Sequence, residues 1–118
     1  MTAYALAHLY DPDPFNPEVI EYIERIQATL DPFGGRFLVH GATVEVHEGE
    51  WPGTVVIIEL PTVEAARDWY ASPAYQEILP LRTNNIDGAT IVVDGVAPRY
   101  DATATAATLR AHAAAGSS

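Results

Sequence analysis

The chain lacks cysteine and lysine, and both absences exclude classes of chemistry. Its 118 residues include no cysteine, and all six of its Lys or Arg positions are arginine. Without thiols there is no disulfide, thiolate nucleophile, iron–sulfur cluster or cysteine-based zinc site. Without lysine there is no Schiff-base chemistry. Ser72, the single serine before the last two residues, lies in an Ala-Ser-Pro context that is typical of a helix N-cap rather than of a nucleophile.

Positive charge is scarce as well. Six basic residues stand against 16 acidic ones, a formal net charge of −10, which argues against nucleic acid and anionic membranes as partners. The longest apolar runs, such as Val55 to Ile58, have the length of a strand and not of a membrane span. No basic region followed by an apolar stretch opens the sequence, so we expect no secretory signal and a cytoplasmic location.

Length and composition indicate one domain with its own core. Hydrophobic residues make up 48% of the 118 positions, which fits a folded chain of this size. We expect this domain to occupy residues 1–97. Residues 98–118 are rich in Ala and Thr with little periodicity, and we interpret them as an appendage: a frayed helix, a swapped arm or a disordered tail.

Alternating apolar residues predict four strands, at about 3–10, 36–48, 54–60 and 89–96. In the first strand, alanines share one face, which suits close packing of a helix. In the second strand, Gly41-Ala42 interrupts the alternation and predicts a bulge or bend there.

Helix signals fill the two long intervals between strands. Asn16 and Pro17 begin a helix that we expect to end near Leu30. A second helix, capped by Thr62, is expected from Val63 to about Arg82, with a break at Ser72-Pro73. The predicted buried stripe of the first helix consists of Val19, Ile20, Ile23, Ile26, Gln27 and Leu30.

The order β, α, β, β, α, β predicts an α+β fold of the ferredoxin-like kind, a four-stranded antiparallel sheet with both helices on one face. Both faces of the strands carry large apolar side chains, yet the helices cover only one face. A large exposed apolar surface is rare on a monomer. The pattern therefore predicts a homodimer in which two sheets pack face to face.

Strand alternation also predicts a functional site on the face without helices. Arginine holds a carboxylate or enolate, histidine moves protons near neutral pH, and a glutamate orients the histidine or acts as base. We therefore expect His40, Arg36 and Glu59 to be catalytic and His8 to contact the ligand. The alternative is a buried Arg36–Glu59 ion pair that fastens the dimer, with the two histidines hydrogen-bonded in the core.

A second candidate group surrounds the broken helix. Trp69, Tyr70, Tyr75 and Arg82 have the side chains expected of a pocket for a planar acid, so we expect them to bind ligand. The alternative is that Trp69 and Tyr75 pack in the core or at the dimer interface and Arg82 caps the helix C-terminus.

The histidines and glutamates of the second strand give no support for a metal or haem site. His40, Glu45, His47 and Glu48 match no known ligand spacing. We therefore expect no metal and no bound cofactor.

Several segments carry a resemblance to a known family. Their order and spacing, over about residues 4–97, resemble the uncharacterised family called domain of unknown function 1330, within the dimeric α/β-barrel superfamily. The resemblance implies a ferredoxin-like fold and a homodimer rather than an activity, since relatives in the superfamily include cofactor-free monooxygenases, haem-degrading enzymes and isomerases of cyclic lactones. The segments are Phe33–Gly41, Glu48-Gly49, Val56–Pro61, Trp69–Gln76 and Pro80–Arg82.

Three functions follow as hypotheses. The first is a cofactor-independent enzyme, of isomerase, lyase or oxygenase type, that acts on a small carbonyl- or carboxyl-bearing metabolite. The second is a dimer that binds such a small-molecule ligand without converting it. The third is a structural partner module that uses the acidic surface and the Ala-rich tail.

Overall fold

The elements follow the predicted order β, α, β, β, α, β, and a further helix comes after the last strand. The computed structural model describes residues 1–10 and 13–116. In this part of the chain, no helix is long and apolar enough to cross a membrane. The elements are β1 (Ala3–Leu9), α1 (Pro17–Leu30), a 3₁₀ turn (Asp31–Phe33), β2 (Arg36–His40), β3 (Thr54–Leu60), α2 (Val63–Ala71), α3 (Pro73–Thr83), β4 (Gly88–Asp94) and α4 (Ala102–Gly116).

Side-chain caps begin the three helices of the domain. The Asn16 side chain accepts hydrogen bonds from the backbone N–H groups at the start of α1, and Thr62 does the same for α2. Ser72 Oγ accepts from the Tyr75 N–H, with Pro73 at the first position of α3. The predicted caps and the break between α2 and α3 are thus confirmed.

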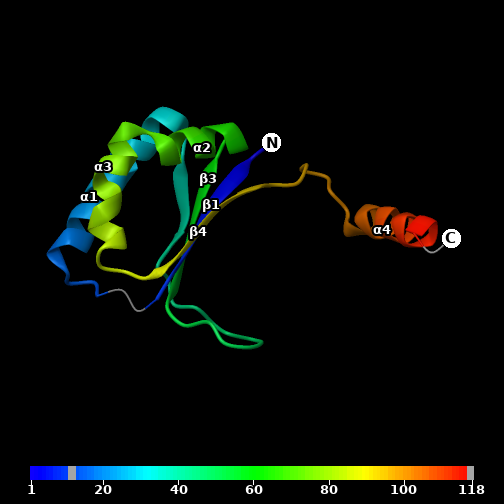
Figure 1. Ribbon diagram of the computed structural model, residues 1–118, viewed down its shortest axis with the longest axis horizontal. Coiled ribbons are helices and arrows are strands. Elements are labelled where there is room, and N and C mark those ends of the chain that lie inside the picture. Colours follow the sequence, from blue (N-terminus) through cyan, green and yellow to red (C-terminus); the bar gives the residue numbers. More distant parts are fainter. Residues whose placement is uncertain (11–12, 117–118) are drawn as a thin grey trace.

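The strands form one antiparallel sheet in the order β2-β3-β1-β4. Helices α1, α2 and α3 lie on one side of this sheet (Figure 1). On β1, Ala3, Ala5 and Leu9 are buried beneath the helices, whereas alternate residues such as Leu6 lie on the other face. The predicted alanine face is therefore the helix face, and the ferredoxin-like architecture is confirmed.

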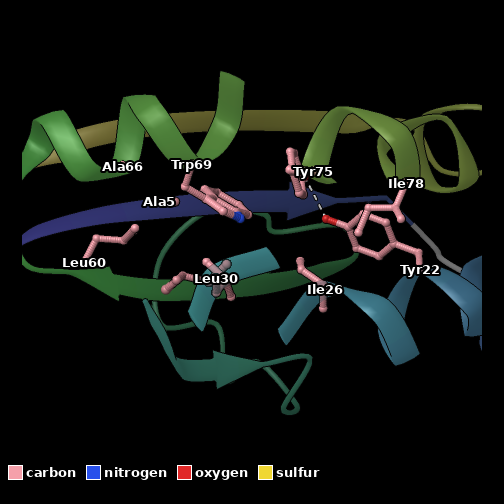
Figure 2. Close-up of a cluster of buried hydrophobic side chains, with 10 residues drawn as sticks. Ala5, Tyr22, Ile26, Leu30, Leu60, Ala66, Trp69, Tyr75 and Ile78 are labelled. Carbon is pink, nitrogen blue, oxygen red and sulfur yellow. Dashed lines mark hydrogen bonds between the residues drawn. The ribbon is translucent and has the colours of Figure 1, made fainter. Parts of the chain in front are cut away.

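The core lies between the helices and the sheet. Figure 2 shows aromatic side chains from α1, α2 and α3 lying against aliphatic side chains from the sheet. Burying this apolar surface is the main stabilising contribution to a domain of this size. The cluster comprises Ala5, Tyr22, Ile26, Leu30, Ile58, Leu60, Ala66, Trp69, Tyr75 and Ile78.

The buried stripe of α1 differs from the predicted one. Tyr22 and Thr29 are buried, whereas Ile20, Ile23 and Gln27 are exposed. Val19, Ile26 and Leu30 are buried as predicted, but the prediction was wrong for the other three positions, because the face of α1 turned to the core passes through Tyr22 and Thr29. The buried polar groups have partners: Thr29 Oγ1 donates to the Ile26 carbonyl at 2.7 Å and accepts from the Trp69 indole N–H at 3.0 Å.

Strand β2 ends at His40, well before the predicted end at residue 48. Gly41 has a positive φ of 76°, and its N–H donates to the Val55 carbonyl as the chain leaves the sheet. The register shift lies between Phe37 and Val39, around Leu38, and not at Gly41-Ala42 as predicted. Residues 41–53 form a loop that extends away from the sheet (Figure 1).

The second apolar face predicted for the sheet is present and uncovered. We call this surface, made of Tyr4, Leu6, Ile57, Ile91 and Val93, the open face. Its side chains share one parity through the register of β1 with β3 and β4. Ile91 is 54% exposed and Val93 is 44% exposed, so large apolar side chains of β4 contact solvent.

The segment after residue 97, predicted as an appendage, contains α4. Figure 1 shows α4 (orange to red) standing away from the domain at the end of an extended stretch. All of its residues are exposed. Of the alternatives left open for residues 98–118, the structure shows a helix over Ala102–Gly116.

Candidate functional site

A cavity of about 600 Å³ lies between the helices and the sheet. Its walls are largely apolar, with Ala5 and Ala7 of β1 on the sheet side and Ile26 of α1 on the helix side. The small alanine side chains leave space that larger residues would fill. The volume is in the range of small-molecule pockets, which are typically concave and apolar with a few polar groups.

The polar groups of the cavity include two tyrosines and an arginine from two helices. The hydroxyls of Tyr22 (α1) and Tyr75 (α3) share a hydrogen bond of 2.8 Å, drawn as a dashed line in Figure 2. The guanidinium carbon of Arg82 (α3) lies 5.7 Å from the centre of the Tyr22 ring, in cation–π range. All three residues line the cavity.

Arg82 is buried without a carboxylate partner in the described chain. Its exposure is 7%, and in residues 1–10 and 13–116 no Asp or Glu oxygen lies within 4.0 Å of its guanidinium. Burial opposes the charged form, but Tyr75 and Tyr22 outweigh it and raise the pKa of Arg82. A buried cation with no counter-ion is costly unless another group, such as a ligand anion, compensates the charge.

Tyr22 remains neutral at physiological pH. Burial, followed by the influence of Tyr75, raises the pKa of Tyr22 far above its usual range. In the shared bond one hydroxyl donates to the other, which leaves the second hydroxyl with a proton of its own. The cluster therefore offers a ligand oxygen one phenolic donor together with the guanidinium.

His40 lines the same cavity from the sheet side. The register shift around Leu38 pairs His40 with Val56, which directs both residues to the helix face. The imidazole stacks on the Phe37 ring with centroids 4.3 Å apart and planes 12° apart. Partial burial lowers the pKa of His40, so its neutral form, which is able to accept a proton, predominates at neutral pH.

The lowered pKa of His40 has a consequence for stability. Because the folded protein binds a proton at His40 less readily than the unfolded chain, His40 destabilises the fold as the pH falls below about 6.5. We expect wild type to lose more unfolding free energy than His40→Gln between about pH 7 and pH 5. Urea unfolding at several pH values measures this difference. If the unfolding free energies of wild type and His40→Gln changed equally with pH, the prediction would be contradicted.

Arg36 and Glu59 form an ion pair on the open side of the sheet, away from His40. Arg36 Nε donates to Glu59 Oε2, and the two residues face each other across β2 and β3. The prediction that His40 meets these two residues was wrong, because the bulge around Leu38 reverses the side on which His40 lies. In the single chain the Arg36 side chain is 70% exposed, so the pair contributes little to stability.

The other predicted ligand residues divide between the cavity and the remainder of the fold. Trp69 and Tyr75 belong to both the core and the cavity wall, and Arg82, in the last turn of α3, lines the cavity. Tyr70 packs against this core but does not line the cavity. His8 lies on the open side, where it stacks on Trp51 with centroids 4.0 Å apart and donates to the Pro52 carbonyl.

Tyr22 is the site residue that the sequence prediction missed. It was left off the buried stripe of α1, although Val19, Tyr22 and Ile26 follow the helical spacing of three and four residues. A tyrosine on that stripe is a signal of a buried hydroxyl that needs a partner.

Three or more metal-binding side chains do not come together within residues 1–10 and 13–116. Of the histidines and glutamates weighed for a metal site, His47 and Glu45 form an exposed pair, with His47 Nε2 at 2.7 Å from Glu45 Oε2. His40 lies apart from it, in the cavity wall.

The fold and the cavity together define a ferredoxin-like α+β domain with space for a small ligand between its helices and its sheet. The chain belongs to the family called Domain of unknown function (DUF1330), whose model matches residues 2–96. The predicted family is thereby confirmed, and α4 lies outside the matched region. No curated protein sequence matches the chain.

Solved structures with the same fold include proteins of unknown function and one oxygenase. The RPA0582 protein of Rhodopseudomonas palustris is 19% identical with a TM-score of 0.62, over 82% of this chain and 84% of that one. A dimeric ferredoxin-like protein of Thermobifida fusca is 17% identical with a TM-score of 0.54, over 80% and 92%. A mutant form of SnoaB, a cofactor-independent oxygenase of Streptomyces nogalater, is 13% identical with a TM-score of 0.56, over 85% and 98%. At these identities the likeness concerns the fold.

Proposed function

We propose that the cavity binds a small, partly aromatic metabolite through an anionic oxygen, carried by a carboxylate, an enolate or a phenolate. The observation that carries this proposal is Arg82, a buried guanidinium that lines an apolar cavity without a carboxylate partner in the described residues. A ligand oxyanion would supply the missing countercharge. Trp69, Tyr75 and Phe37 offer aromatic surface to the remainder of the ligand.

We propose further that the protein is an enzyme that moves a proton without a bound cofactor. Neutral His40 would take a proton from a carbon next to a carbonyl group, or from a phenol, and become imidazolium. Arg82 and the free tyrosine O–H would hold the enolate or phenolate oxygen that results. Many isomerase, lyase and cofactor-independent oxygenase reactions begin with such a step, and SnoaB is a precedent for the oxygenase on this fold.

A panel of matched ligand pairs tests the binding step. Aromatic acids such as benzoate, phenylacetate and naphthoate are expected to raise the unfolding temperature of the protein, whereas the corresponding amides are not, because the amides carry no charge for Arg82. Equal stabilisation by acid and amide would contradict the proposal. Ligand recovered unchanged after incubation, with and without O₂, would favour the alternative of a non-catalytic binding dimer.

We also propose that the open face is covered by a second copy of the chain. Its exposed apolar side chains are concentrated on one flat surface, and the T. fusca neighbour with the same fold is described as dimeric. Replacing Ile91, an exposed residue of the open face, by arginine would bury two unpaired charges in such an interface. We expect Ile91→Arg to be monomeric in sedimentation equilibrium under conditions where wild type is a dimer. A dimeric Ile91→Arg variant would place the interface elsewhere.

A further inference from the structure

Helix α4 stands away from the domain at the end of an extended stretch (Figure 1). Residues 102–113 are exposed, and Leu109 is 62% exposed. An isolated helix of this length is marginal in water, and threonine lowers its stability further. Ala106, Leu109 and Ala113 recur at helical spacing and form a narrow apolar stripe, with Arg110 beside it. The stripe and the arginine suit contact with a surface that is apolar and negatively charged.

The charges of the chain are divided between the domain and this segment. Residues 1–97 hold 15 of the 16 acidic residues and four of the six arginines. Residues 98–118 hold Arg99 and Arg110 against a single carboxylate, Asp101. The segment is therefore slightly positive and the domain strongly negative, so α4 is electrostatically complementary to a domain surface of this same chain.

The position of α4 favours the domain of a second copy over its own domain. The register places the end of β4 beside Ala3 and the start of β3 beside Leu9. The segment 95–116 and loop 41–53 thus leave from opposite ends of the sheet. In Figure 1 both extend on the side opposite α1 and α3, which is the side of the open face. A second copy seated on the open face would lie between them.

We infer that α4 is an exchanged arm, which packs its Ala106–Leu109–Ala113 stripe against the domain of the second copy and sets Arg110 among that domain's carboxylates. This inference rests on the proposed homodimer through the open face, and it adds a contact from outside the family domain. In the dimer the two arms are equivalent, so each protomer both gives and receives one.

Charge reversal in the full-length chain tests the electrostatic part of the inference. We expect Arg110→Glu to raise the dimer dissociation constant about tenfold at about 20 mM salt, with most of the effect gone at about 500 mM. The matched control is Arg67→Glu, which makes the same change at an exposed position of α2 in the helix layer. Sedimentation equilibrium provides the constants. Equal dimer dissociation constants for Arg110→Glu and Arg67→Glu would contradict the exchanged arm.

Photocross-linking tests the contact directly, since the chain has no cysteine to compete for a label. Ala106→Cys carrying benzophenone maleimide is mixed with unlabelled ¹⁵N-enriched wild type, and Ala71→Cys on α2 serves as the control site. We expect cross-links between light and heavy chains from position 106 and not from position 71. Cross-links within one chain alone, in a sample that sediments as a dimer, would contradict the exchanged arm but not the homodimer. A wild type that sediments as a monomer would overturn both.

Discussion

The Arg82→Gln variant is expected to bind aromatic acids about 100-fold more weakly than wild type, because a charge-assisted bond in a buried site is lost. The amides of the same acids are expected to bind the variant and wild type alike. Titration calorimetry with any acid that stabilises wild type provides both affinities. The change removes the charge, and glutamine keeps a polar hydrogen-bonding group on a shorter side chain.

Stability distinguishes a binding role for Arg82 from a structural one. A buried guanidinium that lacks a carboxylate in the described chain costs free energy in the unliganded protein. Arg82→Gln is therefore expected to keep the unfolding free energy within about 1 kcal/mol of wild type, or to raise it. Arg67→Gln, at an exposed site, is the control for both measurements. A collapse in stability with unchanged affinity would make Arg82 a structural residue.

The Gly53→Ala variant is expected to lose about 3 kcal/mol or more of unfolding free energy, because two penalties combine at this position. Gly53 has a positive φ of 87°, which L-residues rarely adopt. A Cβ there would lie 1.9 Å from the Leu9 carbonyl oxygen, so loop 41–53 and the end of β1 would have to separate. Urea unfolding measures the loss.

Gly41→Ala is the matched control for this change. Gly41 begins the same loop with a similar φ of 76°, but among the described residues no atom beyond its chain neighbours lies within 4 Å of its added Cβ. Its expected cost is the conformational penalty alone, about 1–2 kcal/mol. If the two variants were equally destabilised, contact with Leu9 would not be the reason for glycine at residue 53.

The fold followed from the sequence because its signals are local. The caps at Asn16, Thr62 and Ser72 and the alternation on β1 each depend on neighbouring residues. The end of β2 did not follow, because the residues after Gly41 continue to alternate although they have no strand to pair with. Pairing is a property of the sheet, and alternation alone does not report it.

The residue types of the candidate site could be predicted from the sequence, but which of these residues lie together in the structure could not. Trp69, Tyr75 and Arg82 were chosen as aromatics with an arginine, and the structure brings them to one cavity. His40 was assigned to the other face of the sheet because one extra residue in β2 inverts every side chain beyond it. A bulge of this kind has no reliable local signature, so the face of the sheet on which His40 lies could not be predicted from the sequence.

The alanines of β1 determine the size of the cavity, whereas residues on other elements supply its polar groups. Arg82, Tyr22 and His40 would recognise the charge and move the proton, whereas Ala5 and Ala7 on a different element determine how much room is left. Lengthening either alanine to valine would shorten the ligand that fits without altering a polar contact. On this scaffold, the size of the proposed ligand would thus be tunable by a few methyl groups while the polar groups proposed for the reaction stay the same.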